Sequence, residues 1–183
     1  MVRKLKFHEQ KLLKKVDFIS WKVDNNLHEV KIMRKYHVEK REEYTLYNKL
    51  SREIRFVAKK ISKLPANEPF RSECTARLLH KLYSMGLIKQ KTSLELVDRI
   101  TASSFCRRRL PFQMVIQKMA ESLPAAVRFI EHGHVRVGTE IVTDPAFLVT
   151  RTLEDFITWV NTSAIKKHVL NYNNTRDDYD LYC

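Results

Sequence analysis

The cationic and imidazole side chains between residues 107 and 136 are the part of this sequence best suited to chemistry. Three arginines stand in a row from 107 to 109, and Arg136 follows two histidines. Guanidinium groups match phosphate oxygens with paired N–H donors, and imidazoles add hydrogen bonds. Such a set suits a nucleic acid, both its phosphates and its exposed bases. The candidate ligand residues are Arg107, Arg108, Arg109, Gln113, Lys118, Arg128, His132, His134 and Arg136, with Lys4 and Lys6 near the N-terminus.

The arginine triplet is expected at the start of a helix. Positive charge there opposes the helix macrodipole by about 0.3–1 kcal/mol per group. A solvated helix start would leave that cost in place, whereas a bound anion would offset it. We therefore expect at least two of the three arginines to contact RNA phosphates. Ser122 is more readily explained as a helix cap than as a ligand.

Other chemistries find little support in the residue types. His132 and His134 are spaced like a metal pair, but no third ligand stands nearby in a metal-binding pattern, so no metal is expected. Cys106 is close to arginines that could lower its thiol pKa, yet no base or substrate pocket is evident. The three glycines, at 86, 133 and 138, cannot form a phosphate-binding glycine loop. We expect no catalytic residue, no cofactor, no small-molecule substrate and no enzyme activity.

The overall charge of the chain also favours a nucleic acid as its partner. The chain has 183 residues and a net charge of +13, and residues 1–60 hold 17 Lys and Arg against 8 Asp and Glu. This excess favours a polyanionic partner, most often a nucleic acid. A membrane surface is the competing explanation, but no apolar run of about 18 residues and no signal peptide occurs, so no membrane contact is expected. Three widely spaced cysteines suggest reduced thiols in an intracellular protein.

The first hundred residues are expected to be mostly helical. Residues 1–20 mix lysines with a few apolar anchors, and a long helix is predicted from about Val30 to Leu64, ending before Pro65. A second helix is predicted from Arg71 to Met85, with Gly86 at its C-terminal end. The apolar stripe of the long helix consists of Tyr44, Tyr47, Leu50, Ile54, Val57 and Ile61, and that of the second helix of Leu78, Leu79 and Leu82.

Two short helices and a hairpin are expected next. The first helix starts near Phe105 and carries the arginine triplet, with Leu110, Met114, Val115 and Met119 inward. The second starts at Ser122, with Ala126, Phe129 and Ile130 inward, and stops at Gly133. The residues 134–137 alternate polar and apolar, Gly138 begins a turn, and Ile141–Val142 forms the return strand until Asp144–Pro145 breaks it.

This order of residues resembles the S4 RNA-binding domain, found in small-subunit ribosomal protein S4 and in many RNA-modifying enzymes. The resemblance implies an α+β fold, a basic helical N-terminal half followed by a small S4-type module of two helices and a hairpin. We divide the chain into a basic extension (1–20), a basic helical region like that of ribosomal protein S4 (21–100), an S4-type domain (101–170, core 107–155) and an acidic, polar tail (171–183). The residues that carry the resemblance are Arg108-Arg109-Leu110, Ser122, Ala126, Ile130, Gly133-His134-Val135, Val137-Gly138 and Asp144-Pro145.

The whole chain resembles the branch of this family that belongs to the U3 small nucleolar ribonucleoprotein. That resemblance implies a non-catalytic assembly factor of the nucleolar small-subunit processome. It would bind U3 snoRNA and the pre-rRNA, in the 5′ external spacer and the 18S region, and promote their base pairing before early 18S processing. It also implies two protein partners, a large acidic scaffold protein and a Brix-domain protein. A structural ribosomal protein of the S4 family is the alternative, while an RNA-modifying enzyme would need a catalytic domain for which the chain has no room.

Overall fold

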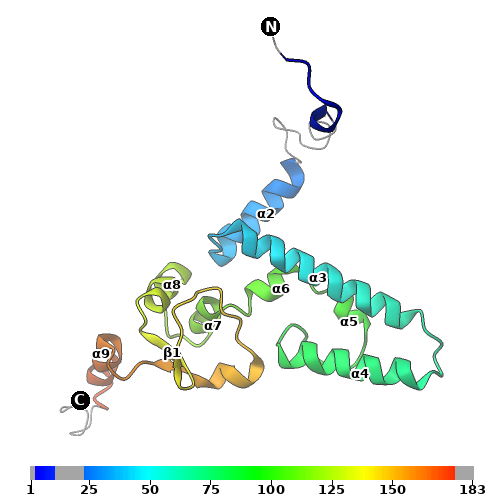
Figure 1. Ribbon diagram of the computed structural model, residues 1–183. Helices are drawn as coiled ribbons and strands as arrows, with labels where there is room; N and C mark the ends of the chain where they lie inside the picture. Colours follow the sequence, from blue (N-terminus) through cyan, green and yellow to red (C-terminus); the bar gives the residue numbers. More distant parts are fainter. Residues whose placement is uncertain (1–2, 11–22, 176–183) are drawn as a thin grey trace.

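The computed structural model describes residues 3–10 and 23–175 of this chain (Figure 1). The expectations for residues 11–22 and for the tail from residue 176 lie outside the described residues. The helical half contains α2 (Val23–Tyr36), α3 (Arg41–Ser62), α4 (Pro69–Ser84), α5 (Glu95–Asp98) and α6 (Ala102–Cys106). The rest contains α7 (Leu110–Ile116), α8 (Leu123–Glu131), β1 (Val135–Val137), β2 (Glu140–Ile141), the 3-10 helix η1 (Arg151–Phe156), β3 (Ile157–Trp159) and α9 (Ala164–Tyr172).

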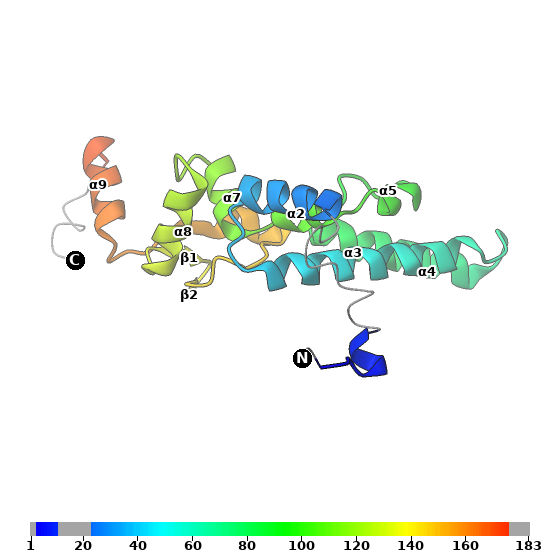
Figure 2. The ribbon, with the colours of Figure 1, turned by 90° about the horizontal axis from the view of Figure 1, so that it is seen from above.

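This architecture confirms the predicted α+β fold, with helices first and a small sheet in the C-terminal part. The long helices α3 and α4 run side by side, and α7, α8 and the sheet gather at the opposite end of the body from their connection (Figures 1 and 2). None of the helices within the described ranges is long and apolar enough to cross a membrane.

The predicted helix from Val30 to Leu64 is in fact two helices. His37 takes a φ of +49° between α2 and α3, and the backbone N–H of Val38 donates to the Met33 carbonyl at 2.9 Å. This reversal lets Tyr36 and Val38 both enter the core, where each is buried. Because the turn contains neither Gly nor Pro, the sequence carried no local signal for it.

The first core lies under α3. Tyr44, Tyr47 and Ile61 of the predicted stripe are buried, and the Tyr47 ring stacks on Phe105 with centroids 5.6 Å apart. Val57 was predicted to face inward but is 43% exposed, since the helix turns Ala58 toward the core instead. Both positions satisfy three- or four-residue spacing, so periodicity alone could not separate them.

A second core fills the C-terminal module. Leu110, Met114, Ala126 and Ile130, all predicted to face inward, are completely buried there between α7, α8 and the sheet. As predicted, α8 begins directly after Ser122 and ends before Gly133, but the Ser122 side chain forms no capping hydrogen bond. The two helices therefore form one compact support for the hairpin.

The hairpin is confirmed, but the sheet has a third strand that was not predicted. β1 pairs antiparallel with β2, joining Arg136 to Ile141 and Val137 to Glu140, and Gly138 begins the turn with a φ of +64°. On its other edge β1 pairs antiparallel with β3, giving the order β2-β1-β3. Trp159 in β3 packs edge-on against Phe129, at 5.6 Å between centroids.

The two cores are joined along a short backbone seam. The backbone N–H of Leu110 donates to the Phe147 carbonyl at 2.9 Å, and that of Val149 donates to the Arg108 carbonyl at 2.8 Å. Across the same seam, the Arg151 guanidinium lies 4.1 Å from the centre of the Tyr83 ring and donates to the Ile88 carbonyl at 2.8 Å. The end of α4 is thereby fixed against η1.

Gly86 allows the closest approach at this seam. It ends α4 with a φ of +74°, and a Cβ atom placed on it would lie 2.6 Å from Cζ of Arg108. That guanidinium is held in place by protein partners, so it cannot swing aside freely. The sequence predicted this glycine as a helix end but could not show what passes beside it.

We expect Gly86→Ala to lower the free energy of unfolding by about 2–4 kcal/mol, because left-handed strain of about 1–2 kcal/mol adds to the displacement of Arg108. The matched control is Gly138→Ala, which has a similar φ of +64° but no atom within 4 Å of the added Cβ. Urea unfolding of both variants measures the difference. Equal losses would show that Arg108 tolerates the added methyl group.

Candidate nucleic-acid interface

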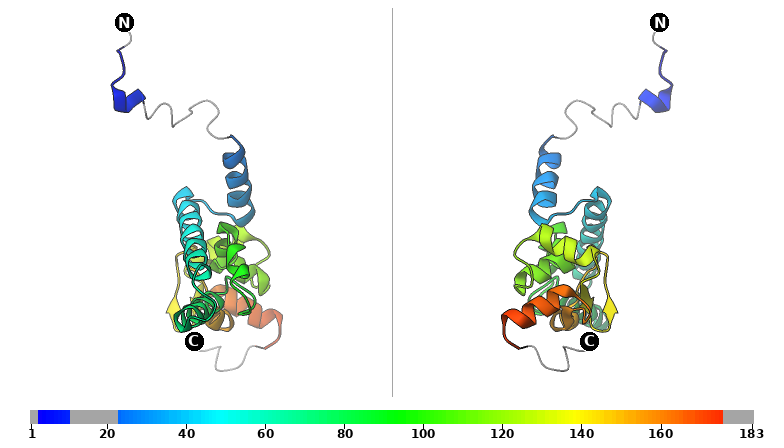
Figure 3. Two further views of the ribbon diagram at one scale, coloured as in Figure 1. Left: turned by 90° about the vertical axis from the view of Figure 1, so that its right-hand side faces the viewer. Right: turned by 90° about the vertical axis from the view of Figure 1, so that its left-hand side faces the viewer.

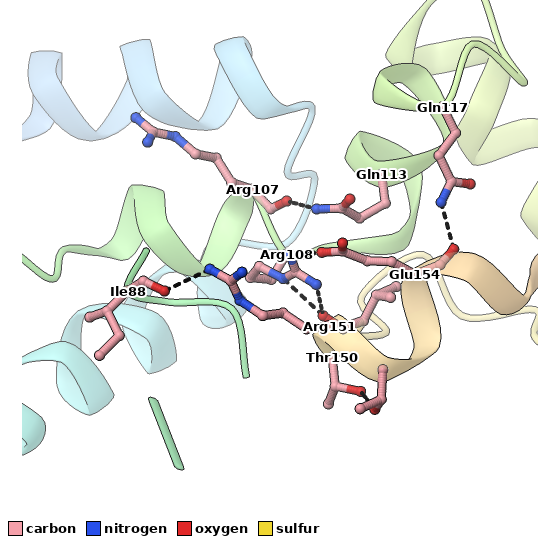
Figure 4. Close-up of polar contacts among 10 residues, drawn as sticks. Ile88, Arg107, Arg108, Gln113, Gln117, Thr150, Arg151 and Glu154 are labelled. Atoms are coloured by element: carbon pink, nitrogen blue, oxygen red, sulfur yellow. Dashed lines mark hydrogen bonds and ion pairs between the residues drawn. The ribbon is translucent and has the colours of Figure 1, made fainter. Parts of the chain in front are cut away.

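The arginine triplet does not lie at the surface as one unit. It occupies the link between α6 and α7, and the side chains of Arg107 and Arg108 point in different directions there (Figure 4). Arg108 is 8% exposed and Arg109 only 3% exposed, whereas Arg107 is exposed. The three residues therefore cannot share one function.

Arg108 is held by the segment that follows the sheet turn. Its Nε and Nη2 donate to the Val149 carbonyl at 2.9 and 2.6 Å, and its Nη1 forms an ion pair with Glu154 of η1. A buried guanidinium needs this kind of complete pairing, since an unpaired buried charge is very costly. Arg108 thus ties α7 to the chain around residues 149–154.

Arg109 is held from the other side. Its Nη1 forms an ion pair with Glu43 in the first turn of α3, and its side chain is almost wholly enclosed. This contact joins residues 66 positions apart in the sequence. Arg109 thus ties the helical half to the start of α7.

The predicted RNA contact at Arg108 and Arg109 is therefore corrected. The helix-start argument predicted an external anion. For Arg108 and Arg109 this is wrong, because their charges are paired with Glu154 and Glu43 of the protein itself. Gln113, also predicted as a ligand, is 6% exposed and donates its Nε2 to the Arg107 carbonyl at 2.7 Å. None of these three side chains is free to meet a ligand at the surface.

We expect Arg109→Ala to lower the free energy of unfolding by about 3–5 kcal/mol, since it leaves Glu43 without its buried partner. Arg77→Ala serves as the control because the Arg77–Glu73 pair is exposed, at 79% and 58% of the two side chains. Its loss should cost less than about 0.5 kcal/mol. Urea denaturation compares them, and similar values for both would show that the buried pair contributes nothing beyond a surface pair.

Exposed candidates gather instead along the end of α8 and the start of β1. Arg128 and His132 are four residues apart on one helical face, and both are exposed. The His132 ring lies parallel to that of His134, with centroids 6.2 Å apart. We call Arg128, His132, His134 and Arg136 the α8–β1 surface.

The β1 side chains of this surface are oriented by their neighbours. Val135 and Val137 point into the second core, which places His134 and Arg136 on the opposite face of the strand. His134 Nδ1 lies 3.0 Å from the Ser163 hydroxyl oxygen, and Arg136 Nε donates to the Thr158 hydroxyl oxygen at 2.9 Å. His134 and Arg136, each hydrogen-bonded to a neighbouring hydroxyl, thus lie beside the exposed Arg128 and His132. Together these groups form a site that can bind a phosphate and also hydrogen-bond to a base.

Lys118 lies just after α7 in an unusual conformation. Its φ is +60°, and the following N–H, of Met119, donates to the Met114 carbonyl at 2.9 Å. The bend returns Met119 to the second core while the lysine side chain is exposed. A glycine would adopt this backbone with less strain, so the bend itself does not require a lysine at this position.

The remaining candidates lie elsewhere. Lys4 and Lys6 are exposed, on a segment that stands away from the α8–β1 surface beyond α2 (Figures 1 and 3). The structure thus brings together the cations of α8 and β1, but not those of the N-terminus.

Cys106 does not behave as an activated thiol. Its side chain is fully buried, and desolvation raises its pKa to about 11, outweighing the opposing charge of Arg109. The proximity of arginines in the sequence pointed to a lowered pKa, but burial has the larger effect. In the described ranges, no group of three or more His, Cys, Asp and Glu side chains could hold a metal ion.

We expect Cys106 to resist alkylation at pH 8 in the folded protein while the partly exposed Cys74 reacts. Peptide mapping after timed iodoacetamide treatment measures both rates. In 8 M urea the two rates should converge, since the burial is then lost. Equal rates in native buffer would show that Cys106 is accessible.

Two family models match the chain in succession. The ribosomal protein S4/S9 N-terminal domain matches residues 4–107, and the S4 domain matches residues 108–155. Among curated proteins, the chain is 60% identical to the mouse (Mus musculus) U3 small nucleolar ribonucleoprotein protein IMP3, over 99% of each chain. It is 52% identical to the Saccharomyces cerevisiae protein of that name, over 99% of this chain and 100% of the other. It is 31% identical to the small ribosomal subunit protein uS4 of Sulfurisphaera tokodaii, over 75% of this chain and 77% of the other.

Proposed function

Because the chain belongs to the S4 family, in the branch of the U3 small nucleolar ribonucleoprotein protein IMP3, we propose that it is an RNA-binding factor of small-subunit ribosome assembly. In this proposal it binds U3 snoRNA and the pre-rRNA, in the 5′ external spacer and the 18S region. Holding both strands promotes their base pairing before the early processing of 18S rRNA.

The α8–β1 surface is the observation that carries this proposal. It offers guanidinium and imidazole groups on a rigid support of two packed helices and a sheet. Such groups contact phosphates through charge and single-stranded bases through hydrogen bonds and stacking. Because the support is packed, the RNA meets donors already held in place, which reduces the entropy lost on binding.

The proposed protein partners and location follow from the same family membership. The net charge of +13 suits a large acidic scaffold protein as well as RNA, and a Brix-domain protein would complete the subcomplex. Such an assembly would place the protein in the nucleolus. The basic N-terminal segment with Lys4 and Lys6, standing away from the α8–β1 surface, could reach a second strand or a neighbouring subunit.

A structural ribosomal protein is the alternative, favoured by the similarity to uS4 over three quarters of the chain. Sucrose-gradient sedimentation of cell extracts separates the two. We expect the protein with pre-ribosomal particles and U3 snoRNA, and absent from mature 40S subunits. Stoichiometric presence in mature subunits would instead establish the structural role.

Lys118 allows stability and RNA binding to be separated. We expect Lys118→Gly to raise the free energy of unfolding by up to about 1 kcal/mol, because glycine adopts the positive φ more easily. The same change should weaken RNA binding and flatten its dependence on salt by about 0.7 in the slope of log K against log salt, one phosphate contact on a single strand.

Filter binding of labelled U3 snoRNA at several salt concentrations, with urea denaturation, gives both quantities. Lys118→Gln is the matched control, since it removes the charge but keeps the backbone strain. It should weaken binding equally without gaining stability. An unaltered salt slope in both variants would remove Lys118 from the RNA surface.

A further inference from the structure

We propose that a second RNA-binding site lies in the groove between the end of α4, α5 and α6, and that it holds the phosphate backbone. The inference rests on the proposed function, because it assumes that RNA is the ligand of this chain. We call this site the 89–107 groove, after the first and the last cation in the sequence that line it, Lys89 and Arg107. Its volume is about 480 Å³, within the usual range of ligand sites.

Every charged side chain that lines the 89–107 groove is positive. Lys89, Arg99 and Arg107 are all exposed, and no carboxylate lines the groove with them. Within the described residues, Lys89 and Arg99 have neither an ion pair nor a side-chain hydrogen bond. This contrasts with Arg108 and Arg109, each of which has its own glutamate.

Arg107 contributes an oriented guanidinium to this groove. Its Nε donates to the Tyr36 hydroxyl oxygen at 3.2 Å, which leaves both terminal nitrogens available. In Figure 4 its side chain extends away from Arg108, Arg151 and Glu154. A guanidinium fixed at Nε presents its remaining donors in one plane, the geometry that a phosphate accepts.

The floor of the groove suits the rest of a nucleotide. Ile88 and Ile100 are buried beneath it, Leu96 is partly buried, and Gln90 and Ser104 supply polar groups near the cations. A groove lined by cations is one of the two features with which proteins follow a single strand, the other being aromatic rings on which the bases stack. Since no aromatic ring lines the groove, binding there should depend on the backbone and little on base identity.

The groove has a fixed relation to the α8–β1 surface. Arg107 is followed directly by Arg108 and Arg109, whose buried ion pairs join both halves of the molecule. The Ile88 carbonyl at the groove also accepts a hydrogen bond from Arg151 of η1. Two RNA sites on one rigid body would hold two RNA segments at a set distance, as an RNA-pairing factor requires.

The test uses the full chain and labelled U3 snoRNA, titrated with salt. Lys89→Gln with Arg99→Gln should weaken binding several-fold and flatten the salt slope by about 1.4, two phosphate contacts at about 0.7 each. The midpoint of urea unfolding should not change, because neither side chain has a protein partner among the described residues. Lys63→Gln with Lys81→Gln is the matched control, since it removes the same charge from exposed positions outside both surfaces.

A third variant, Lys118→Gln with Arg128→Gln, separates this inference from the proposed function. If that variant flattens the slope and the groove variant behaves like the control, the groove is not an RNA site while the proposed function stands. If the unaltered chain fails to bind RNA, the proposed function fails with it.

If the groove variant keeps its RNA affinity but loses binding to a polyglutamate peptide, the groove binds an acidic protein and the inference is overturned. Parallel loss in both variants, with an additive loss when they are combined, supports two separate RNA sites.

Discussion

The pairing of two adjacent buried guanidinium groups with carboxylates from opposite sides of the molecule is the constraint on which the structure depends. Arg108 binds Glu154 and the Val149 carbonyl, and Arg109 binds Glu43. Neither charge could remain in the interior without its partner, because burial of an unpaired ion is too costly. The helical half, α7 and η1 must therefore fold together around residues 108 and 109.

This constraint divides the positive charge of the chain into two kinds. Arg108 and Arg109 are neutralised by carboxylates of the protein and maintain its shape, while Arg128, His132 and the cations of the 89–107 groove are exposed to solvent. The net charge of the chain does not distinguish the paired, buried cations from the exposed ones. A run of arginines in a basic chain can therefore be structural in two of its three members, although all three have the residue type of a phosphate ligand.

Local patterns allowed much of the C-terminal module to be predicted. Ser122 lies directly before α8, Gly133 just after it and Gly138 in the tight turn, each where the local sequence predicted it. Contacts between distant segments could not be predicted in this way. Glu43 stands 66 residues from Arg109, β3 is only three residues long, and the turn at His37 contains no Gly or Pro. In each case the deciding contact is tertiary, so the missing information was absent from the local sequence.

Photo-crosslinking of the purified chain to 4-thiouridine-labelled U3 snoRNA, followed by mass spectrometry of the attached peptides, tests the central claim most directly. The account predicts attachment within residues 118–136, at Lys118 and the α8–β1 surface, and within residues 87–107, at the groove. It predicts none at the buried side chains of Arg108 and Arg109. Crosslinks confined to other segments, with residues 118–136 unmodified, would contradict it.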